Sequence, residues 1–495
     1  MLKKSISHRL LAVLCLGALV LGLVPLLVLS GYNHACFDDY RFGTLTRAAW
    51  EESHSLTGVL SAAVEFAREF RQSWEGTYTT SFLSSLQPGI FGGYQWTAPL
   101  LLGVFLVCLW FFLHQVLGKE LGADPWRVAA IFALSGFLLI QMMPCVSEAF
   151  FWFNGGVAYL LMWDFMLLRW GVWLCLRRAE KPLSRGVLTG VMVLLTILAG
   201  GAKYTNVLFC LCVDGCITLL SLWKKTRLRF VNLGLTVLLG LCLLFSVLAP
   251  GNGVRAEAVT SEHCSPVKAI AESLYFGVAL MGDYCTLPML VLFGLSVWLL
   301  LPELKQSSFA FPCPLGVTLG GMILYCVQMT PTLYMRMYLG SGRVYNTHFC
   351  TFGVMGLLLS LYWAGWAVKR QPQLVEAGKK TGLGLGAFLC ALVLLVTGLC
   401  AFKPDEETYY GLQNLSGVSA ALSLVTGEAQ QFDQAMEERE AALLDPDTEV
   451  VEVAFIEGNP SCLMGDTLCG EHVEETLEML SGMYGKKVVL RQGEN

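Results

Sequence analysis

Long runs of apolar residues recur along the chain and are separated by short polar segments. The first run extends from Leu10 to Leu29, and about 20 apolar helical residues are needed to cross the roughly 30 Å core of a bilayer. Ten later runs predict further spans at Thr97–Leu117, Trp126–Met142, Val157–Leu176, Val187–Leu198, Thr205–Trp223, Val231–Leu248, Tyr284–Leu301, Leu315–Thr330, Phe349–Val368 and Leu383–Ala401. The pattern therefore predicts eleven transmembrane helices, with Val267–Met281 as an additional amphipathic or re-entrant segment.

The composition supports this prediction, because 55% of the residues are hydrophobic and only 14% are charged. A chain of this length cannot bury so much apolar surface in one water-soluble core. The fold class that we predict is an α-helical polytopic membrane protein. The first apolar run is longer than the core of a typical signal peptide and lacks a convincing cleavage site, so we interpret it as an uncleaved span.

Basic residues mark alternate loops. Lys3, Lys4 and Arg9 precede the first predicted span. Most of the other Lys and Arg residues of the short loops lie in the loops after the second, fourth, sixth, eighth and tenth spans, and Lys203 is an exception. By the positive-inside rule, the N-terminus is cytoplasmic. An odd number of spans then places the C-terminal tail outside the cytoplasm, on the same face as Asp38 and Asp39. We expect a multi-pass protein of the cell membrane.

The tail differs in charge from the rest of the chain. Residues 402–495 contain 19 of the 38 acidic residues and 5 basic ones, a net charge of −14, which leaves +9 for residues 1–401. This acidity argues against nucleic acid as a partner. The patterns in the tail predict helices over Val418–Leu444, broken at Gly427, and over Glu471–Met483, and strands over Glu449–Ile456 and Lys487–Leu490. We therefore divide the chain into a transmembrane domain, residues 1–401, and a small extracytoplasmic α+β domain, residues 402–495, in which Cys462 and Cys469 are close enough in sequence to pair.

The predicted outer face carries the long loops and most of the unusual polar residues. The loop over residues 31–96 opens with the adjacent carboxylates Asp38 and Asp39 directly after the first span. Candidate ligand-binding residues on the same face are Arg41, Trp74, Tyr78, Glu148, Asn154, Arg255, Arg336, Arg343 and Asn346. Acids, cations and aromatic rings together are what a site for a sugar-phosphate lipid requires.

Five motifs in order carry a resemblance. They are Phe37-Asp38-Asp39-Tyr40, Trp74-x-Gly76, Glu148-x-x-Phe151-Trp152-Phe153-x-Gly155, Ala249-Pro250-Gly251-Asn252-x-x-Arg255 and Arg343-x-x-Asn346. With this order of spans, loop and tail, the chain resembles the GT-C superfamily of membrane glycosyltransferases and, more narrowly, a bacterial family of multi-span proteins of unknown function. The chain departs from that family at residues 201–206, where Lys203 lies in a turn that more usually carries an acidic residue.

The resemblance implies a GT-C-like fold and an activity. Such enzymes take a sugar from a polyprenyl-phosphate-linked donor and pass it to an extracytoplasmic glycan, lipid or protein. Asp38 or Asp39 would take the proton of the acceptor hydroxyl, with inversion at the anomeric carbon. Arginines would stabilise the leaving phosphate. The resemblance implies no certain cofactor and leaves a divalent metal ion open, although no zinc-type spacing is present in the sequence.

Each assignment has a simpler structural alternative. The Asp pair would also suit a helix cap or a solvated turn, and only one of two adjacent residues is expected to face a substrate. Glu148 would then be a structural carboxylate, and the arginines would extend to the membrane interface. Trp74 and Tyr78 would belong to the aromatic belt at that interface. Two other classes of function stay open: a transporter or flippase of lipid-linked sugars, and a non-enzymatic assembly protein of the cell envelope.

Overall fold

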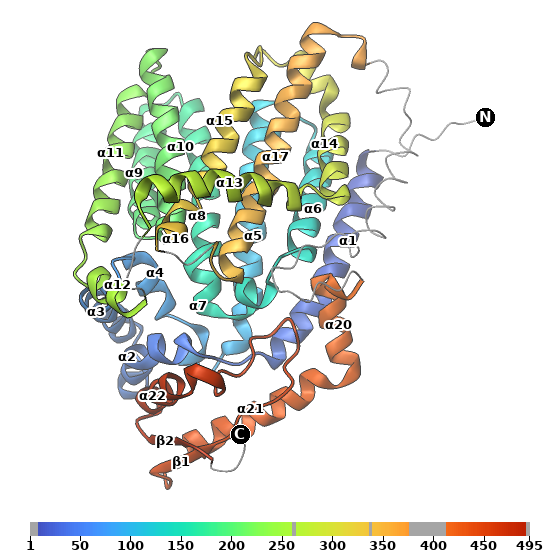
Figure 1. Ribbon diagram of the computed structural model, residues 1–495. Coiled ribbons are helices and arrows are strands. Elements are labelled where there is room, and N and C mark those ends of the chain that lie inside the picture. Colours follow the sequence, from blue (N-terminus) through green and yellow to red (C-terminus); the bar gives the residue numbers. More distant parts are fainter. Residues whose placement is uncertain (1–7, 260–263, 336–338, 376–411, 492–495) are drawn as a thin grey trace.

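The protein is described by a computed structural model over residues 8–259, 264–335, 339–375 and 412–491, and it is almost entirely helical (Figure 1). Eight segments of it are long and apolar enough to cross a membrane. They are His8–Tyr32, Tyr94–Glu120, Phe153–Arg178, Pro182–Gly200, Tyr204–Trp223, Arg229–Val247, Leu287–Gln306 and Gly342–Arg370. The predicted class, a helical membrane protein, is confirmed.

The predicted count of eleven spans is not reproduced in full. Two predicted spans correspond to shorter apolar helices, α6 (Pro125–Gln141) and α15 (Pro314–Val327), which have 17 and 14 residues. A helix rises 1.5 Å per residue, so α15 on its own is about 21 Å long and does not cover a 30 Å hydrocarbon core. The predicted span Leu383–Ala401 lies outside the described residues.

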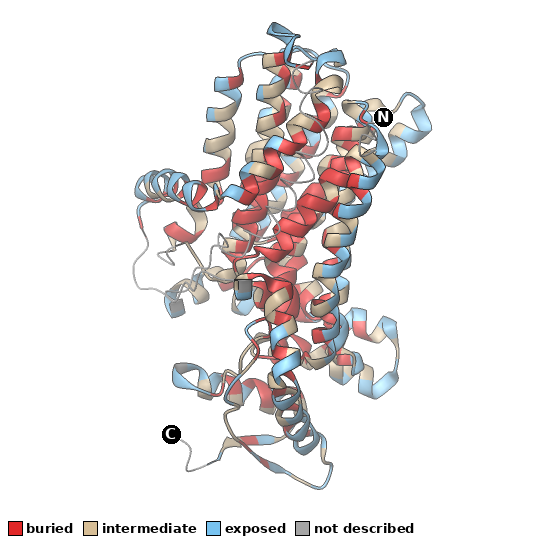
Figure 2. Cartoon of the chain, turned by 90° about the vertical axis from the view of Figure 1, so that its right-hand side faces the viewer, coloured by how far each residue is buried: buried red, intermediate tan, exposed pale blue. Residues whose placement is uncertain are grey.

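The principal helices of the bundle run between its two ends. They are α1 (His8–Leu29), α5 (Thr97–Leu113), α8 (Met162–Arg178), α9 (Pro182–Gly200), α10 (Tyr204–Trp223), α11 (Arg229–Val247), α14 (Leu287–Gln306) and α17 (Gly342–Arg370). The core lies where they meet, and the outward faces of the peripheral helices are exposed (Figure 2). Because those exposed faces are rich in Leu and Val, we assign them to contact with lipid acyl chains.

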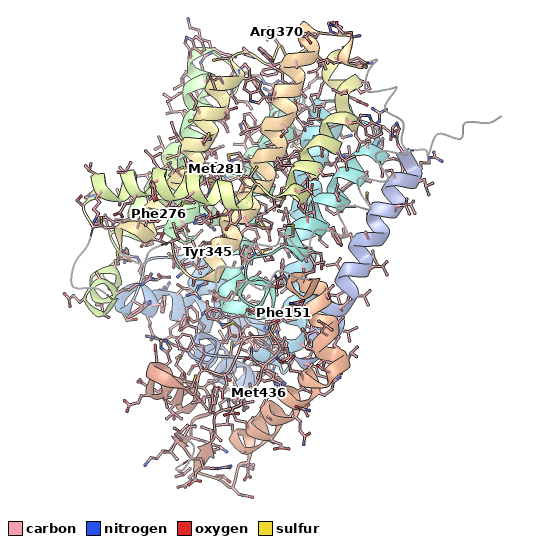
Figure 3. All side chains as sticks on the ribbon, turned by 45° about the vertical axis from the view of Figure 1, so that its right-hand side comes forward. Phe151, Phe276, Met281, Tyr345, Arg370 and Met436 are labelled. Atoms are coloured by element: carbon pink, nitrogen blue, oxygen red, sulfur yellow. The ribbon has the colours of Figure 1, made fainter. Side chains whose placement is uncertain are left out.

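Helix α13 (Pro266–Tyr284) runs across the bundle, as the positions of Phe276 and Met281 show in Figure 3. Its exposed side carries apolar residues at helical spacing, including Val267, Ile270 and Val278. This geometry agrees with the interpretation of the segment as a piece that does not span the bilayer.

The two ends of the bundle differ. The described chain begins at one end and the C-terminal unit packs on the other, which also carries Asp38 (Figure 1). Hydrogen bonds join the two parts there: Ser416 Oγ donates to the Ile140 carbonyl at 3.0 Å, and the Gly417 N–H donates to Gln141 Oε1 at 2.8 Å. The prediction that the Asp pair and the tail lie on the same face thus agrees with the structure. Its assignment to the outside of the cell stays a prediction.

This assignment is testable by labelling. In a variant whose exposed native cysteines are replaced by Ser, we expect Glu52→Cys and Asp447→Cys, both at exposed positions, to react with a membrane-impermeant thiol reagent in intact cells. Lys225→Cys, an exposed position at the opposite end of the bundle, should react only after permeabilisation, because the positive-inside rule places it in the cytoplasm. Labelling of Lys225→Cys alone in intact cells would invert the topology.

The end that carries the Asp pair is built largely from helices that lie outside the membrane-crossing segments. These are α2 (Asp38–Ser53), α3 (Leu56–Ser73), α4 (Tyr78–Ser84) and α12 (Gly251–Val259), while α7 (Phe153–Gly156) is the first turn of the segment Phe153–Arg178 and α16 (Thr330–Tyr334) packs on α13. The rings of Phe42, Phe66 and Phe70 pack together between α2 and α3. This layer joins the membrane helices to the C-terminal unit.

The C-terminal unit has the predicted order of elements. It consists of α20 (Ser416–Thr426), α21 (Glu428–Leu444), β1 (Val450–Val453), α22 (Val473–Tyr484) and β2 (Lys487–Leu490), and β1 and β2 pair in parallel. Its small core includes Tyr40 of the first loop, so the unit is anchored to the membrane part by apolar packing. Cys462 and Cys469 are not joined by a disulfide: their thiols donate to the carbonyls of Ser416 and Asp466.

Candidate functional site

Asp39 is held in a fully buried network. Its side chain is 0% exposed and accepts hydrogen bonds from the Tyr94 hydroxyl at 2.5 Å, from the Asn154 N–H at 3.1 Å and from the Cys36 N–H at 3.3 Å. Burial raises the pKa of Asp39 to about 7, against the opposing effect of these donors. All of its partners belong to the protein, so Asp39 ties α2 to the segment before α5 and to α7.

We expect Asp39→Asn to lower stability. The two oxygens of Asp39 accept from three donors, whereas an amide replaces one oxygen with an NH₂ group that must face at least one of these donors, which costs about 1–3 kcal/mol. The pKa of Asp39 is raised from 3.8 to about 7 on folding, so the folded state binds more protons in this window and wild-type stability falls as the pH rises through it. Thermal unfolding in detergent between pH 4 and pH 7 should therefore show a difference in melting temperature between wild type and variant, and this difference should become smaller as the pH rises. The exposed acid Asp447 provides the control, Asp447→Asn, for which we expect no such trend.

Asp38 has a different environment. Its side chain is half-buried, and burial raises the pKa of this carboxyl while the positive charges of Arg343 and Lys203 act in the opposite direction. Glu475 of α22 also acts on it, so the C-terminal unit approaches the same carboxylate. A partly exposed carboxylate with a raised pKa that is influenced by nearby cations is suited to accept a proton.

The residue before Asp38 has a strained backbone. Phe37 has φ = +44°, a conformation that is uncommon for a bulky side chain. Its ring lies 6.5 Å from that of Trp152 and 5.5 Å from that of His472, which packs on it from the C-terminal unit. Such strain persists only where the surrounding packing holds it, and it concentrates at functional positions.

Glu75 joins two cations. It is 1% exposed, forms ion pairs with both Lys203 and Arg255, and accepts a hydrogen bond from the Thr77 hydroxyl at 2.6 Å. Burial alone would raise the pKa of Glu75, but the charges of Lys203 and Arg255 outweigh it and lower this pKa to about 2. The carboxylate is therefore ionised near neutral pH and fixes two cations from different elements beside each other.

The motifs that carry Glu75 and Arg255 meet by backbone contact. A Cβ atom added to Gly76 would lie 2.0 Å from the Ser246 carbonyl oxygen, and one added to Gly251 would lie 2.4 Å from the Trp74 nitrogen. Only glycine permits this approach. The Gly76 N–H also donates to Asn252 Oδ1 at 3.4 Å. These glycines therefore place Arg255 within reach of Glu75.

Glu148 and Arg343 form the third ion pair of the site. Glu148 Oε2 accepts from Arg343 Nη1 at 3.1 Å and from the Arg343 N–H at 2.9 Å. The guanidinium lies 4.8 Å from the ring centre of Trp152 and 5.8 Å from that of Tyr159. Glu148 thus holds the start of α17 and orients a cation over an aromatic surface.

The three cations line one cavity. It has a volume of about 670 Å³ and lies between the ends of α10, α11, α12, α16 and α17, with Lys203, Arg255 and Arg343 in its wall. The rest of the wall is largely apolar or aromatic, including Val247, Pro331 and Tyr334. A cavity of this size with a few polar groups in an apolar wall is typical of a ligand site, and three cations favour a phosphorylated ligand.

A second, more polar cavity lies where the first loop meets the C-terminal unit. Its volume is about 300 Å³, and its lining includes His34, Tyr94 and Arg47 from the loop and Asp433 and Glu437 from α21. His34 pairs with Asp433 at 2.8 Å. Met436 of α21 also lines this cavity, and Figure 3 shows it in the C-terminal unit, below Phe151. Tyr94 lines this cavity and bonds Asp39.

The other predicted site residues have mixed positions. Trp74 lies between two cations, 5.8 Å from Arg41 and 6.0 Å from Arg255, and so belongs to the site. Tyr78 instead donates to the Ile197 carbonyl at 2.6 Å, which joins α4 to α9. Arg336 lies outside the described residues.

Two predicted ligand-binding residues have structural roles. Asn154 enters the site through its backbone N–H, which donates to Asp39. The Asn346 side chain is fully buried and makes two hydrogen bonds with the backbone of Cys145. The Cys145 N–H donates to Asn346 Oδ1 at 2.8 Å, and Asn346 Nδ2 donates to the Cys145 carbonyl at 2.7 Å. We therefore assign to Asn346 the positioning of α17 rather than contact with a ligand.

Three residues of this arrangement were not among the predicted site residues. Lys203 was the exception to the positive-inside rule, and a cation on the unexpected face was itself a signal for a site. Glu75 lies inside the Trp74-x-Gly76 motif. Tyr94 had no local signal, because its role depends on contact with Asp39, 55 positions away.

The site has no obvious metal centre within the described ranges. In residues 8–259, 264–335, 339–375 and 412–491, no three His, Cys, Asp or Glu side chains gather closely enough to hold a metal ion.

The chain matches no known protein family, and no curated protein is significantly similar to it.

Proposed function

We propose that the protein is a membrane glycosyltransferase that uses a polyprenyl-phosphate-linked sugar as donor and an extracytoplasmic glycan, lipid or protein as acceptor. The observation that carries the proposal is the cavity of about 670 Å³ with Lys203, Arg255 and Arg343 in its wall, near the half-buried Asp38. The cations suit a lipid phosphate, and the apolar wall at the ends of the membrane helices suits the first part of its chain.

Asp38 is the base in this proposal. The acceptor oxygen attacks the anomeric carbon, its proton passes to the Asp38 carboxylate, and the bond between the sugar and the phosphate oxygen breaks with its electron pair on the phosphate. Attack opposite the leaving group inverts the configuration. The charge that develops on the phosphate is stabilised by Arg343 and Arg255, which Glu148 and Glu75 hold in fixed positions.

The acceptor is assigned to the second cavity. That cavity is polar, lies against the C-terminal unit and shares Tyr94 with the Asp39 network. Donor and acceptor would thus approach the Asp pair from different sides. This arrangement supports a role for the C-terminal unit in binding the acceptor.

Arg343 tests the proposal. We expect Arg343→Ala to lower transfer about 100-fold, because one fixed donor to a developing anion contributes about that much. Arg343→Lys should recover only part of the loss, since an ammonium lacks the planar two-donor fork. The measurement is the release of polyprenyl phosphate from a panel of polyprenyl-phosphate-linked sugars by membranes that contain the protein. Arg68→Ala, at an exposed position on α3, is the matched control, and equal rates for Arg343→Ala and Arg68→Ala would contradict the proposal.

A transporter of lipid-linked sugars is the alternative, and intramembrane charges favour it. Asp214 of α10 pairs with Arg169 of α8 at 2.6 Å, and Asp164 is buried in α8. Charges inside membrane helices often mark transport paths. Reconstituted protein that moves lipid-linked sugar across liposomes, yet releases no polyprenyl phosphate with any acceptor, would replace the glycosyltransferase proposal with this one.

A further inference from the structure

A third cavity lies at the end of the bundle opposite the Asp pair. Its volume is about 310 Å³, and it is formed where α8 ends, α10 ends and α11 begins. In Figure 1 this end of α10 and α11 is the one farthest from the C-terminal unit. The cavity is thus separated from the proposed transferase site by the length of the membrane helices.

Cations surround the opening of this cavity. Arg177, Lys224 and Arg227 belong to its lining, and none of the described lining residues is Asp or Glu. Glu120, which lies outside the lining, pairs with Arg177 and Arg178 and offsets part of the charge. Lys224 and Arg227 keep the opening positive. An anion with several oxygen acceptors fits this arrangement.

The interior of the cavity is preorganised. Trp173 Nε1 donates to Asn232 Oδ1 at 3.0 Å, and both residues line the cavity. Arg227 Nη2 donates to the carbonyls of Arg177 and Ala179 at 3.1 and 2.8 Å, which ties the α10–α11 turn to the end of α8. Arg177 and Arg227 are therefore held at the cavity by contacts that need no ligand.

The position of the cavity favours a lipid as the source of the anion. Helices α8, α10 and α11 belong to segments that are long and apolar enough to cross the membrane, and each has one terminus here. The cations are therefore expected at the level of the headgroups. Leu220 lines the cavity and is 54% exposed, which provides an apolar path from the cavity to the acyl-chain region. Basic pockets between membrane helices on the cytoplasmic side are suited to anionic headgroups.

We infer that this cavity binds the phosphate headgroup of an anionic phospholipid in the leaflet opposite the transferase site. Lys224 and Arg227 contact the phosphate, and one acyl chain runs along Leu220. The inference is independent of the proposed transferase activity, because no residue of the cavity belongs to that site.

Lipid binding by the purified full-length protein tests the inference. Native mass spectrometry in detergent compares phosphatidylglycerol with phosphatidylcholine of the same acyl chains. We expect at least tenfold stronger retention of phosphatidylglycerol by the wild type, and loss of this preference in Lys224→Gln/Arg227→Gln. The control Lys225→Gln/Arg370→Gln removes the same charge at the same end of the bundle, where Figure 3 shows Arg370, and should keep the preference.

Two further arms make the result decisive. Arg227 also holds a turn, so the single variant Lys224→Gln, at an exposed position, must weaken phosphatidylglycerol binding several-fold with an unchanged melting temperature. Inorganic phosphate at the same concentration as the lipid must fail to displace it. Unchanged binding by Lys224→Gln, equal loss in the control, or displacement by inorganic phosphate would each overturn the inference.

Discussion

Asp38→Asn should abolish transfer of the sugar while leaving the protein folded in the membrane. The amide keeps the size of the side chain and its ability to accept a hydrogen bond but cannot take the acceptor's proton, and a positioned general base typically contributes 10²- to 10⁴-fold. We expect a loss of about 10³-fold in the release of polyprenyl phosphate, with normal amounts of protein in the membrane. Asp38 is half-buried, and its substitution breaks no hydrogen bond of the Asp39 network.

Two variants separate this role from a structural one. Glu52→Gln removes an exposed carboxylate from the same α2 helix and should keep full activity. Asp39→Asn should mainly lower the melting temperature, because all three of its donors belong to the protein. If Asp38→Asn kept full activity while Asp39→Asn lost it in folded protein, the base would be Asp39.

Glu75→Gln should produce the largest loss of stability among single substitutions in the site. Removing this carboxylate leaves Lys203 and Arg255 next to each other without their shared anion. Breaking a buried ion pair by removing one partner costs about 3 kcal/mol or more. Thermal unfolding in detergent should show the drop, and Glu52→Gln should stay within about 0.5 kcal/mol of the wild type, as is usual for exposed positions.

The pH dependence of the Glu75 effect has a definite sign. The pKa of Glu75 falls from 4.5 to about 2 on folding, so the carboxylate stabilises the folded protein fully above its unfolded pKa. This stabilisation is lost as the pH falls from about 4.5 toward 2. The difference in stability between wild type and Glu75→Gln should therefore shrink over that range, and a difference independent of pH would show that charge is not its cause.

Local features of the sequence were sufficient for most of the elements. Apolar runs between turns located the eight long membrane helices, and the pattern of the tail located α22 and β2 within a few residues. This succeeded because the length of an apolar run and the residues that cap or break a helix act over only a few positions. The count of spans was less certain, since α15 is too short on its own to satisfy the length rule.

Local features also grouped most of the candidate site residues on one face of the bundle. The alternation of basic loops put Asp38, Glu148, Arg255 and the tail on one face, and α2, α12 and the C-terminal unit do share one end of the structure (Figure 1). The same rule marked Lys203 as an exception, which was the one sequence signal for its place in the site. Charge alternation is readable from sequence because each span reverses the side of the membrane.

Only the tertiary structure decided what each side chain does. Adjacent in sequence, Asp38 and Asp39 differ because one is half-buried near Arg343 and the other is sealed in by Tyr94 and Asn154. Glu75 forms ion pairs with Lys203 and Arg255, which are 128 and 180 residues away in the sequence. No local pattern encodes such pairs, because burial and distance between charges arise only when distant segments pack, and these two quantities determine which carboxylate is ionised, paired or able to take a proton.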